Sequence, residues 1–451
     1  MMWKKSEAEC TRGEMQPMKE AAFGWTRRIE RRARVVLIVA GGGLLAFNLA
    51  RIIHAPIGDF HNHWQLGYNL LRGASLYPYG AEGPSHYSNP YPPFWAMAHA
   101  PLTLFSAHVA QIIVFLPMYI GSLSLLVWTL FHLTRGHLPL DGQRQFWAFT
   151  IAMLVALQFL SRDLSECGVN IGLVALAWFA VYAWTRHRDW LGGASLGLAI
   201  ALKMTAGLFV PYFLWKRQWK IASAAILFAL IFTIAPVVVR GPTRFATDLS
   251  EWFDVLRAGN TGNPSVGVLG PEPIGNFALR PALARLITNG PVATSEPVTT
   301  NLLALPPKVA SAVIYFIKLS LLLAFACMIG RSVGDRKTLA VVYECAGVSL
   351  LMLLLSPITW GHHCVGTLPA LYLICATAFY YGGLPRWMLI PAGYVLLTLI
   401  FNRAIVGKHL SFVMTGYSIV TWEILALLVL TLGCRSLVLR RRAPMPAAPP
   451  S

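Results

Sequence analysis

The sequence predicts an all-α, polytopic integral membrane protein, and three observations lead to this class. Of the 451 residues, 56% are hydrophobic and only 12% are charged, whereas about 25% of an ordinary soluble chain is charged. Apolar runs long enough to cross a membrane recur along the chain. The formal net charge of +18 lies mostly in short hydrophilic segments beside these runs. There it sets membrane orientation, and it does not indicate a nucleic-acid partner.

The N-terminal segment is the first sign of orientation. Residues 1–34 are rich in Lys and Arg, so we expect a cytoplasmic basic tail. The apolar run 35–53 then leads outward, and no small-residue cleavage site follows it, which favours a retained helix over a signal peptide. The seven cysteines form no C-x-x-C pair, so neither a disulfide framework nor a zinc site is indicated.

A polar stretch follows this first run and opens a predicted outer loop, 54–107. Asp59 comes a few residues after the first apolar run. Apolar and aromatic residues then recur at three- and four-residue spacing through 59–73, which predicts an amphipathic helix along the membrane interface. An ordinary extracytoplasmic loop is the alternative. The piece 94–105 is too short to cross and is expected to dip into the interface.

The next apolar runs predict spans at 108–133, 146–161 and 169–185. The basic segment after the first of these is expected in the cytoplasm, and the short turn SRDLSECGVN after the second is expected outside.

Residues 190–215 present a conflict that indicates a hairpin. The run is long enough for one tilted span, yet TRHR before it and WKRQWK after it both have the basic character of cytoplasmic segments. Two half-helices turning near Lys203 remove the conflict, and such broken helices are tolerated where they line a polar cavity. Lys203 would then lie at the outer tip. The alternative is a single span with a snorkelling lysine.

In the remainder of the chain, apolar spans continue to alternate with hydrophilic segments. A span at 221–239 leads to a second outer loop, 240–307, with a helical piece TRFATDLSEWFDVLR. Further spans are expected at 308–330, 339–357, 364–382, 386–404 and 417–437. This gives about twelve crossings in a transmembrane domain over 35–437, with both termini cytoplasmic. Residues 438–451 are expected to be a disordered cytoplasmic tail.

Every conspicuous polar residue falls on one side of this topology. Ionisable groups near a bilayer are costly unless they are paired or solvated, so they suggest a functional cavity. A carboxylate among aromatic residues can act as a general base, and a lysine with arginines nearby offers a phosphate site. The set suits transfer of a group carried on a lipid phosphate. Its members are Asp59, His61, His63, Glu166, Asn170, Lys203, Asn276, Arg280, Arg285, Trp360, His362 and His363.

Several stretches, in order, resemble one enzyme family. The chain is similar to the GT-C membrane glycosyltransferases, and within them to family 87, the polyprenyl-phosphate-mannose-dependent alpha-mannosyltransferases. The resemblance covers roughly residues 35–405. The matching pieces are Asp59 ahead of WQLGYNLLRGASLY, Tyr91-Pro92-Pro93 with Pro101-Leu102 beyond it, GASLGLAIALK with WKRQWK, the stretch from Asn276 to Arg285, and SPITWGHH. Gly168 stands where the family usually has glutamine.

The resemblance implies a GT-C-like fold and a hexosyltransferase. The expected reaction is inverting transfer of a hexose, with mannose as the expected sugar, from a polyprenyl-phosphate donor to a lipid or glycan acceptor hydroxyl. Asp59 would be the catalytic base. The expected donor-phosphate ligands are Lys203, Arg280, Arg285, His362 and His363. The expected sugar and acceptor contacts are Trp64, Tyr91, Glu166, Asn170, Asn276 and Trp360.

For this reaction we expect neither a cofactor nor a metal ion. The cations can stabilise a leaving phosphate by themselves. Neighbouring residues on a helix point about 100° apart, which disfavours His362 and His363 as joint metal ligands. His61 and His63 are expected to be helix-surface residues rather than ligands, and Arg280 and Arg285 are alternatively loop-packing residues. The expected location is the bacterial inner membrane, with the site on the extracytoplasmic side.

A transporter or flippase of a lipid-linked or anionic substrate is the alternative function. Broken helices and intramembrane charge also mark secondary transporters. The sequence shows no second broken hairpin related to the first by pseudo-symmetry, and its polar residues gather on one side. Both features favour the enzyme.

Overall fold

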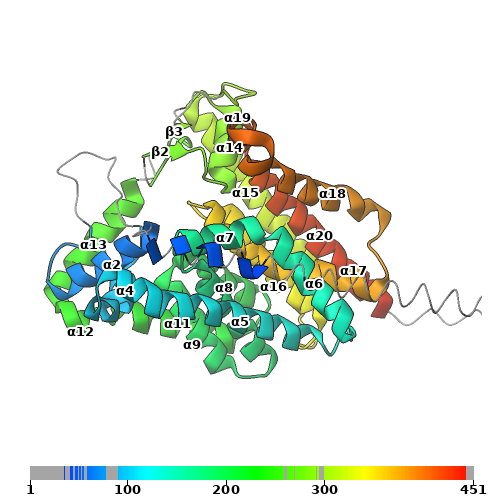
Figure 1. Ribbon diagram of the computed structural model, residues 1–451, viewed down its shortest axis with the longest axis horizontal. Coiled ribbons are helices and arrows are strands. Elements are labelled where there is room, and N and C mark those ends of the chain that lie inside the picture. The colour runs from blue at the N-terminus through cyan, green and yellow to red at the C-terminus, as the bar shows by residue number, and fades with distance from the viewer. Residues whose placement is uncertain are drawn as a thin grey trace, which may run out of the picture. The chain divides into compact units, whose positions relative to one another are not determined.

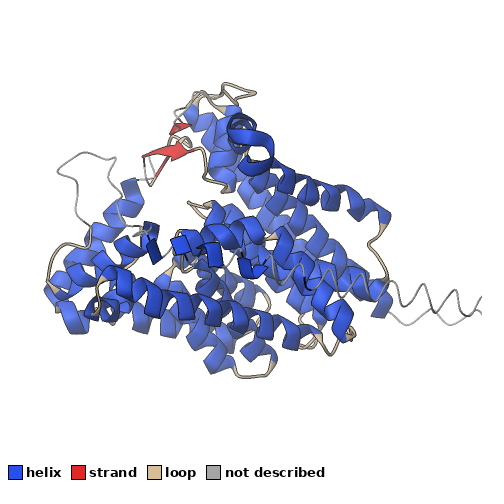
Figure 2. Cartoon of the chain, in the orientation of Figure 1, coloured by secondary structure: helices blue, strands red, loops and turns tan. Residues whose placement is uncertain are grey.

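A computed structural model describes residues 58–77, 90–258, 262–268, 270–290, 292–293 and 299–442, together with scattered helical positions between 35 and 54. The chain divides into two compact units, Met1–Pro56 and Ile57–Ser451, and the account below concerns the second. The predicted tail 1–34, most of the first span and residues 443–451 lie outside the described residues. Helices make up nearly all of the described structure (Figure 2).

Several helices are long and apolar enough to cross a membrane, as predicted. The described part of the chain has five of them, or up to seven if each of two bent helix pairs is one span. The five run over Ala107–Thr134 (α4, η2 and α5), Trp219–Arg240 (α11 and α12), Pro307–Ile329 (α15), Gly361–Tyr381 (η4 and α17) and Ile419–Arg440 within α20. The bent pairs are Gly142–Val155 (α6) with Leu157–Ser165 (α7), and Arg386–Phe401 (η5, α18 and η6) with Ile405–Gly416, which belongs to α19 (Arg403–Gly416).

Shorter apolar helices fill the space between these spans. They are Asn170–Thr185 (α8), Asp189–Leu202 (α9), Met204–Trp215 (η3 and α10) and Leu339–Leu355 (α16). Their lengths explain why a count based on span length falls below the predicted twelve. The helix α20 (Ile419–Arg442) continues past residue 437, where we expected the transmembrane domain to end.

The helix predicted over 59–73 is present as α2 (Gly58–Leu71), and its place at the membrane interface stays a prediction. It contacts α3 (Pro93–His99) and η1 (Ala100–Leu104). The approach is close because Gly67 has no side chain: a Cβ there would lie 2.7 Å from the carbonyl carbon and oxygen of His99. The packing therefore turns one side of α2 toward α3 and η1.

The segment 189–215 forms the predicted hairpin, with its turn at Lys203. Lys203 has an extended backbone (φ −152°, ψ 115°) that separates α9 from η3. The two ends of the segment come together, because the indole N–H of Trp184 donates to Oε1 of Gln218 at 3.3 Å. The basic segments on either side of the hairpin thus lie at the same end of the bundle, which is the arrangement that removes the charge conflict.

A buried cluster of ion pairs connects helices at the end of the bundle where the hairpin begins and ends. The carboxylate of Glu344 on α16 lies 2.8 Å from Nζ of Lys216 and 2.8 Å from Nη2 of Arg435 on α20. The hydroxyl of Tyr212 on α10 also donates to Glu344 at 3.1 Å. Since Lys216 and Arg435 further donate to carbonyls at the end of α15, the cluster joins four helices.

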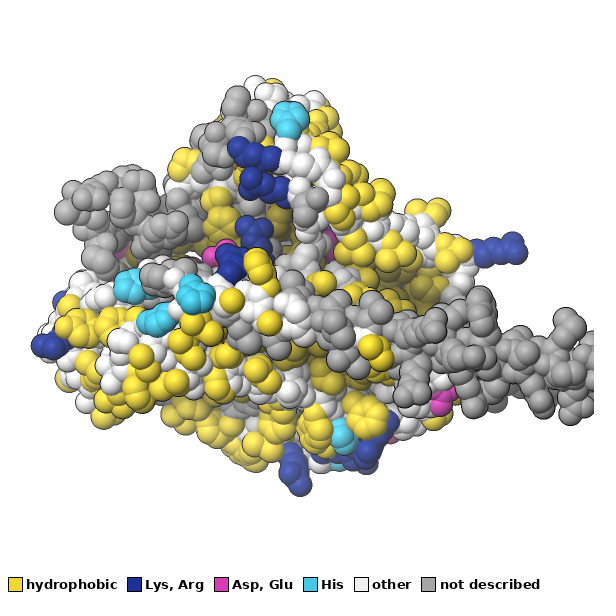
Figure 3. Space-filling view, in the orientation of Figure 1, with side chains coloured by type: hydrophobic (Ala, Val, Ile, Leu, Met, Phe, Trp, Pro, Cys, Tyr) yellow, Lys and Arg dark blue, Asp and Glu magenta, His cyan; other side chains and the backbone are white. Residues whose placement is uncertain are grey.

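The segment 240–307, which we expect to be an outer loop, contains α13 (Pro242–Ala258), the predicted helical piece, and α14 (Leu279–Ile287). A small sheet accompanies them, with β1 (Val266–Gly267) antiparallel to β2 (Gly270–Pro273) and β2 parallel to β3 (Val292–Ala293). In Figure 1, α13 lies beside α2, whereas α14 lies with β2 and β3 beside α19. In Figure 3, dark blue and magenta side chains gather around a hollow between these two regions.

Candidate active site

The described part of the chain forms a cavity of about 800 Å³. Its walls come from segments far apart in the chain: α2, the end of α7, the tip of the hairpin, α13, and the stretch from the end of α16 into η4. The stretch entering η4 is the SPITWGHH sequence. Of the residues predicted as site residues, the cavity is lined by Asp59, Tyr91, Glu166, Lys203, Trp360, His362 and His363.

Asp59 lies in the first turn of α2, with its side chain 40% exposed. Its Oδ2 is 3.8 Å from Nε2 of His362. Burial raises the pKa of the Asp59 carboxyl above its ordinary value, the charge of Glu166 adds to the rise, and the charge of Lys203 opposes it. A carboxylate with a raised pKa, beside a histidine and open to a cavity, has the properties of a proton acceptor.

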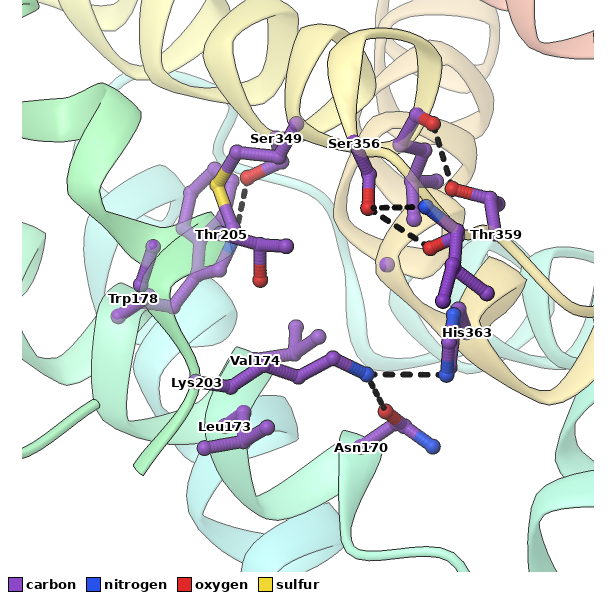
Figure 4. A pocket seen from close by; sticks show the side chains of 16 residues that line it. Asn170, Leu173, Val174, Trp178, Lys203, Thr205, Ser349, Ser356, Thr359 and His363 are labelled. Atoms are coloured by element: carbon purple, nitrogen blue, oxygen red, sulfur yellow. Dashed lines mark hydrogen bonds between the residues drawn. The ribbon is translucent and has the colours of Figure 1, made fainter. Parts of the chain in front are cut away.

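Lys203 reaches the cavity from the tip of the hairpin. Its Nζ donates to Oδ1 of Asn170 at 3.1 Å and lies 2.9 Å from Nε2 of His363 (Figure 4). It also lies 5.8 Å from the centre of the Tyr91 ring. A cation held on two sides in this way is a preorganised partner for an anionic ligand.

Asp163 holds the Asn170 amide that binds Lys203. The sequence did not single out this residue. It is fully buried. Its Oδ1 accepts from Nδ2 of Asn170 at 2.9 Å, and its Oδ2 accepts from the backbone N–H of Ile171 at 3.2 Å. The carboxylate therefore fixes the amide that in turn holds Lys203.

Gly168, where the family usually has glutamine, lies in the turn before α8 and close to Asp163. A Cβ on Gly168 would lie 2.2 Å from Oδ1 of Asp163, so a side chain there would displace that carboxylate. The preceding residue, Cys167, has a left-handed backbone (φ 49°), a conformation that glycine adopts more easily.

Arg162 is a cavity residue that the sequence did not single out. It lines the cavity next to the SPITWGHH stretch, and its Nη1 is 3.2 Å from where a Cβ on Gly361 would lie. The signal in the sequence was the Arg-Asp pair inside a short turn between two apolar runs. From the sequence, this segment is expected only as an outer turn that connects two spans.

Asn276, Arg280 and Arg285 are not among the residues that line the cavity. Arg280 forms an ion pair with Glu272, and Arg285 donates to the backbone oxygen of Asn276 at 2.8 Å. Asn276 itself accepts from the backbone N–H of Thr359 at 2.9 Å and donates to the oxygen of Pro357 at 3.1 Å. These side chains hold the SPITWGHH stretch in place from outside the cavity.

Two residues of α2 differ from expectation. Trp64 is not among the cavity-lining residues, because its indole N–H donates to the backbone oxygen of Phe105 at 3.0 Å. His63, expected on the helix surface, is only 3% exposed and lines the cavity. Its Nδ1 accepts from the indole N–H of Trp95 at 3.1 Å. Burial, followed by the charges of His99 and Lys203, holds the pKa of His63 well below its usual range, so the ring is neutral.

The chain matches the model of glycosyltransferase family 87 over residues 89–357. It is 28% identical over 332 residues to a polyprenol-phosphate-mannose-dependent alpha-(1-2)-phosphatidylinositol mannoside mannosyltransferase of Mycolicibacterium smegmatis, which covers 69% of this chain and 68% of the relative. The protein of the same description in Mycobacterium tuberculosis is 27% identical over 344 residues, or 74% of this chain and 72% of the relative.

A third relative, from Mycolicibacterium smegmatis, is described as a polyprenol-phosphate-mannose-dependent alpha-(1-2)-phosphatidylinositol pentamannoside mannosyltransferase. It is 27% identical over 351 residues, or 76% of this chain and 75% of the relative. No solved structure matches the chain.

Proposed function

The chain belongs to glycosyltransferase family 87, and on that premise we propose that it moves a mannosyl group from a polyprenyl-phosphate donor to a hydroxyl of a lipid or glycan acceptor. The names of three relatives support this donor, and they also name phosphatidylinositol mannosides as acceptors of those relatives. In the reaction, the acceptor oxygen forms a bond to the anomeric carbon. The bond from that carbon to the phosphate oxygen breaks, with inversion, and the polyprenyl phosphate departs.

The observation that carries the mechanism is that Asp59 and Lys203 line one cavity although the chain separates them widely. We assign Asp59 as the base that takes the proton of the acceptor hydroxyl, because its carboxyl has a raised pKa and is open to the cavity. Glu166, close enough to raise that pKa, is the candidate for holding a sugar hydroxyl.

The leaving phosphate is assigned to the cationic side of the cavity. Lys203, held by Asn170 and His363, would carry the principal positive charge. Arg162 and His362, which also line the cavity, would complete the phosphate site. The two fixed cations, Lys203 and Arg162, would stabilise the charge that develops as the phosphate departs.

The remaining predicted site residues receive narrower roles. Tyr91 and Trp360 line the cavity and offer aromatic faces to a sugar ring. We assign Asn276, Arg280 and Arg285 to positioning the SPITWGHH stretch, since their polar groups bind Glu272 and backbone atoms. Trp64 would secure α2 against η1.

The membrane arrangement is part of the proposal. We infer about twelve crossings, cytoplasmic termini and a site on the extracytoplasmic face of a bacterial inner membrane. The alternation of basic segments supports it, and so does the contact between Trp184 and Gln218, which brings two basic segments to one end.

The test uses purified protein in detergent or vesicles with radiolabelled polyprenyl-phosphate mannose and a mannoside acceptor. The parent should form a labelled glycolipid, and Asp59→Asn should lose about 10²–10⁴-fold in transfer while it still binds the donor. Asparagine keeps the size of aspartate and its capacity to accept hydrogen bonds, so a purely structural role of Asp59 in the first turn of α2 would leave transfer largely intact. Asp254→Asn, an exposed residue of α13, is the matched control.

Each outcome separates the hypotheses. Near-parental transfer by Asp59→Asn would exclude it as the base and make Glu166 the next candidate. Movement of the labelled donor across vesicles, with no product formed by the parent, would favour a transporter.

A further inference from the structure

We propose that the face of α2 formed by Asn62, Gln65 and Asn69 is a subsite for an uncharged, polyhydroxylated part of the acceptor, a glycan. The inference rests on the proposed function and adds to it the chemistry of the acceptor beside the reacting hydroxyl. All three amides line the same cavity as Asp59.

The spacing of these residues makes them one continuous surface. Positions 59, 62, 65, 66 and 69 follow the three- and four-residue spacing of a single helix face. The face runs about 15 Å along the axis, at 1.5 Å per residue. The proposed base therefore stands at one end of a row of amides, and a ligand lying along the row would have its terminal hydroxyl at Asp59.

The charge pattern of the cavity selects an uncharged ligand for this row. The charged lining residues Arg162, Glu166 and Lys203 come from α7, the turn after it and the hairpin, not from α2. Past Asp59, the lining residues of α2 are the three amides, Leu66 and the neutral His63. Past Asp59, α2 itself offers a phosphate or carboxylate no cation among its lining residues, whereas sugar hydroxyls can both donate to and accept from amides.

The amides are already oriented and retain unused hydrogen-bonding capacity. Nε2 of Gln65 donates to Oδ1 of Asn69 at 2.9 Å, and Nδ2 of Asn69 donates to the backbone oxygen of Ser75 at 3.3 Å. These bonds leave Oε1 of Gln65 without a protein donor within the described part of the chain. The amide of Asn62 is exposed and has no protein partner there either. Both groups are thus available to a ligand.

The row is also held rigidly at its far end. Arg240 donates to the backbone oxygens of Leu70 at 3.4 Å and Ala74 at 2.8 Å, and its Nε lies 2.7 Å from Oδ2 of the buried Asp248. Together with the close contact at Gly67, this fixes both the position and the rotation of α2. A rigid row lowers the entropic cost of binding a flexible glycan.

The donor's lipid chain would find apolar side chains in another part of the cavity. Met204 and Leu208 of η3, with Met352 and Leu355 of α16, line it with apolar side chains. The elements η3 and α16 contact each other, whereas α2 contacts α3 and η1. An isoprenoid chain gains nothing from a row of amides, so we assign the amide row to the acceptor.

The experiment measures KM for acceptor and donor separately, with octyl dimannoside as an uncharged acceptor and polyprenyl-phosphate mannose as the donor. Asn62→Ala and Gln65→Leu should each raise the KM for octyl dimannoside about 3- to 10-fold, the range of one ordinary hydrogen bond. The donor KM should not change. His61→Ala, on the same helix but outside the cavity lining, is the control and should leave both values unchanged.

The outcomes distinguish this subsite from the function on which it rests. An active parent whose acceptor KM is the same in both variants overturns the subsite and leaves the glycosyltransferase intact. A parent that accepts only phosphatidylinositol-based acceptors and rejects octyl dimannoside overturns the assignment of an uncharged ligand. A parent that transfers mannose to no acceptor overturns the proposed function and this inference with it. Because Asn62 is exposed and unpartnered, loss of folding would not obscure the result for Asn62→Ala.

Discussion

Nζ of Lys203 lies 2.9 Å from Nε2 of His363. One residue is the turn of a broken hairpin, and the other lies in the short helix η4, 160 positions further along the chain. The contact brings the cationic group to the cavity that Asp59 also lines. It therefore links the two chemical roles, proton acceptor and phosphate partner, that the proposed transfer needs.

Replacing Lys203 by methionine should impair transfer far more than folding. Methionine keeps most of the length of the side chain and removes its charge. Hydrogen bonds to charged groups are worth about 1.5–3 kcal/mol, which corresponds to a loss of about 10- to 150-fold in kcat/KM. Steady-state kinetics with labelled donor measures it. Lys220→Met, an exposed lysine, should behave as the parent, and normal turnover by Lys203→Met would remove this residue from the site.

The pH dependence of transfer should report the charge beside Asp59. A base works only when ionised, so the rate should fall as the pH drops through the pKa of this carboxyl. Glu166 contributes to raising that pKa. Glu166→Gln should therefore move the acid limb of the kcat/KM profile to lower pH, whatever its effect on the maximum rate.

The control for this experiment is Glu251→Gln, which changes a carboxylate that accepts from Ser75 and is not among the charges acting on Asp59. It should leave the acid limb in place. A limb that stays unchanged in Glu166→Gln, or moves to higher pH, would contradict the assignment of Asp59 as the titrating group.

A side chain at Gly168 should damage the site although the position lies outside the cavity lining. The Cβ of Gly168→Ala would lie 2.2 Å from Oδ1 of Asp163, and overpacking of this kind costs about 1–3 kcal/mol. We expect a lower apparent melting temperature and reduced transfer, since Asp163 holds Asn170 and through it Lys203. Gly121→Ala, where a Cβ meets nothing within 4 Å, is the matched control and should be neutral.

The buried cluster at the other end of the bundle should matter for stability. Glu344→Gln leaves Lys216 and Arg435 without their shared carboxylate, and removing one partner of a buried ion pair costs about 3–5 kcal/mol. The apparent melting temperature in detergent should fall markedly. Asp141→Asn, at an ion pair whose side chains are 58% and 61% exposed, should change it little. Equal effects of the two substitutions would mean that the cluster adds no special stability.

Cysteine labelling should place both ends of the hairpin on one side of the membrane. His187→Cys and Gln218→Cys should react with an impermeant reagent from the same side, because Trp184 and Gln218 are in contact. Asn301→Cys, which precedes the span α15, should react from the other side. Labelling above the background of the seven native cysteines is the measurement. Opposite sidedness at 187 and 218 would contradict the hairpin and reduce the number of crossings.

The sequence by itself determined the class, the places of the longest spans and the break at Lys203. These features follow from patterns along the chain: apolar length predicts a span, and basic clusters predict the side of the membrane. The spans at Ala107–Thr134 and Pro307–Ile329 lie within a residue of the predicted 108–133 and 308–330. The hairpin was predictable for the same reason, since two basic segments could not otherwise lie on one side.

Only the tertiary structure decided which polar residues enter the cavity. Periodicity defines the faces of α2, but it does not say which face a neighbouring element will cover. Trp64, expected at the sugar site, instead donates to the backbone oxygen of Phe105 at the end of η1. His63, expected on the helix surface, is instead buried. Likewise, Arg162 lines the cavity while Arg280 pairs with Glu272. A long side chain takes whichever partner the fold brings within reach, and that partner lies far away in the sequence.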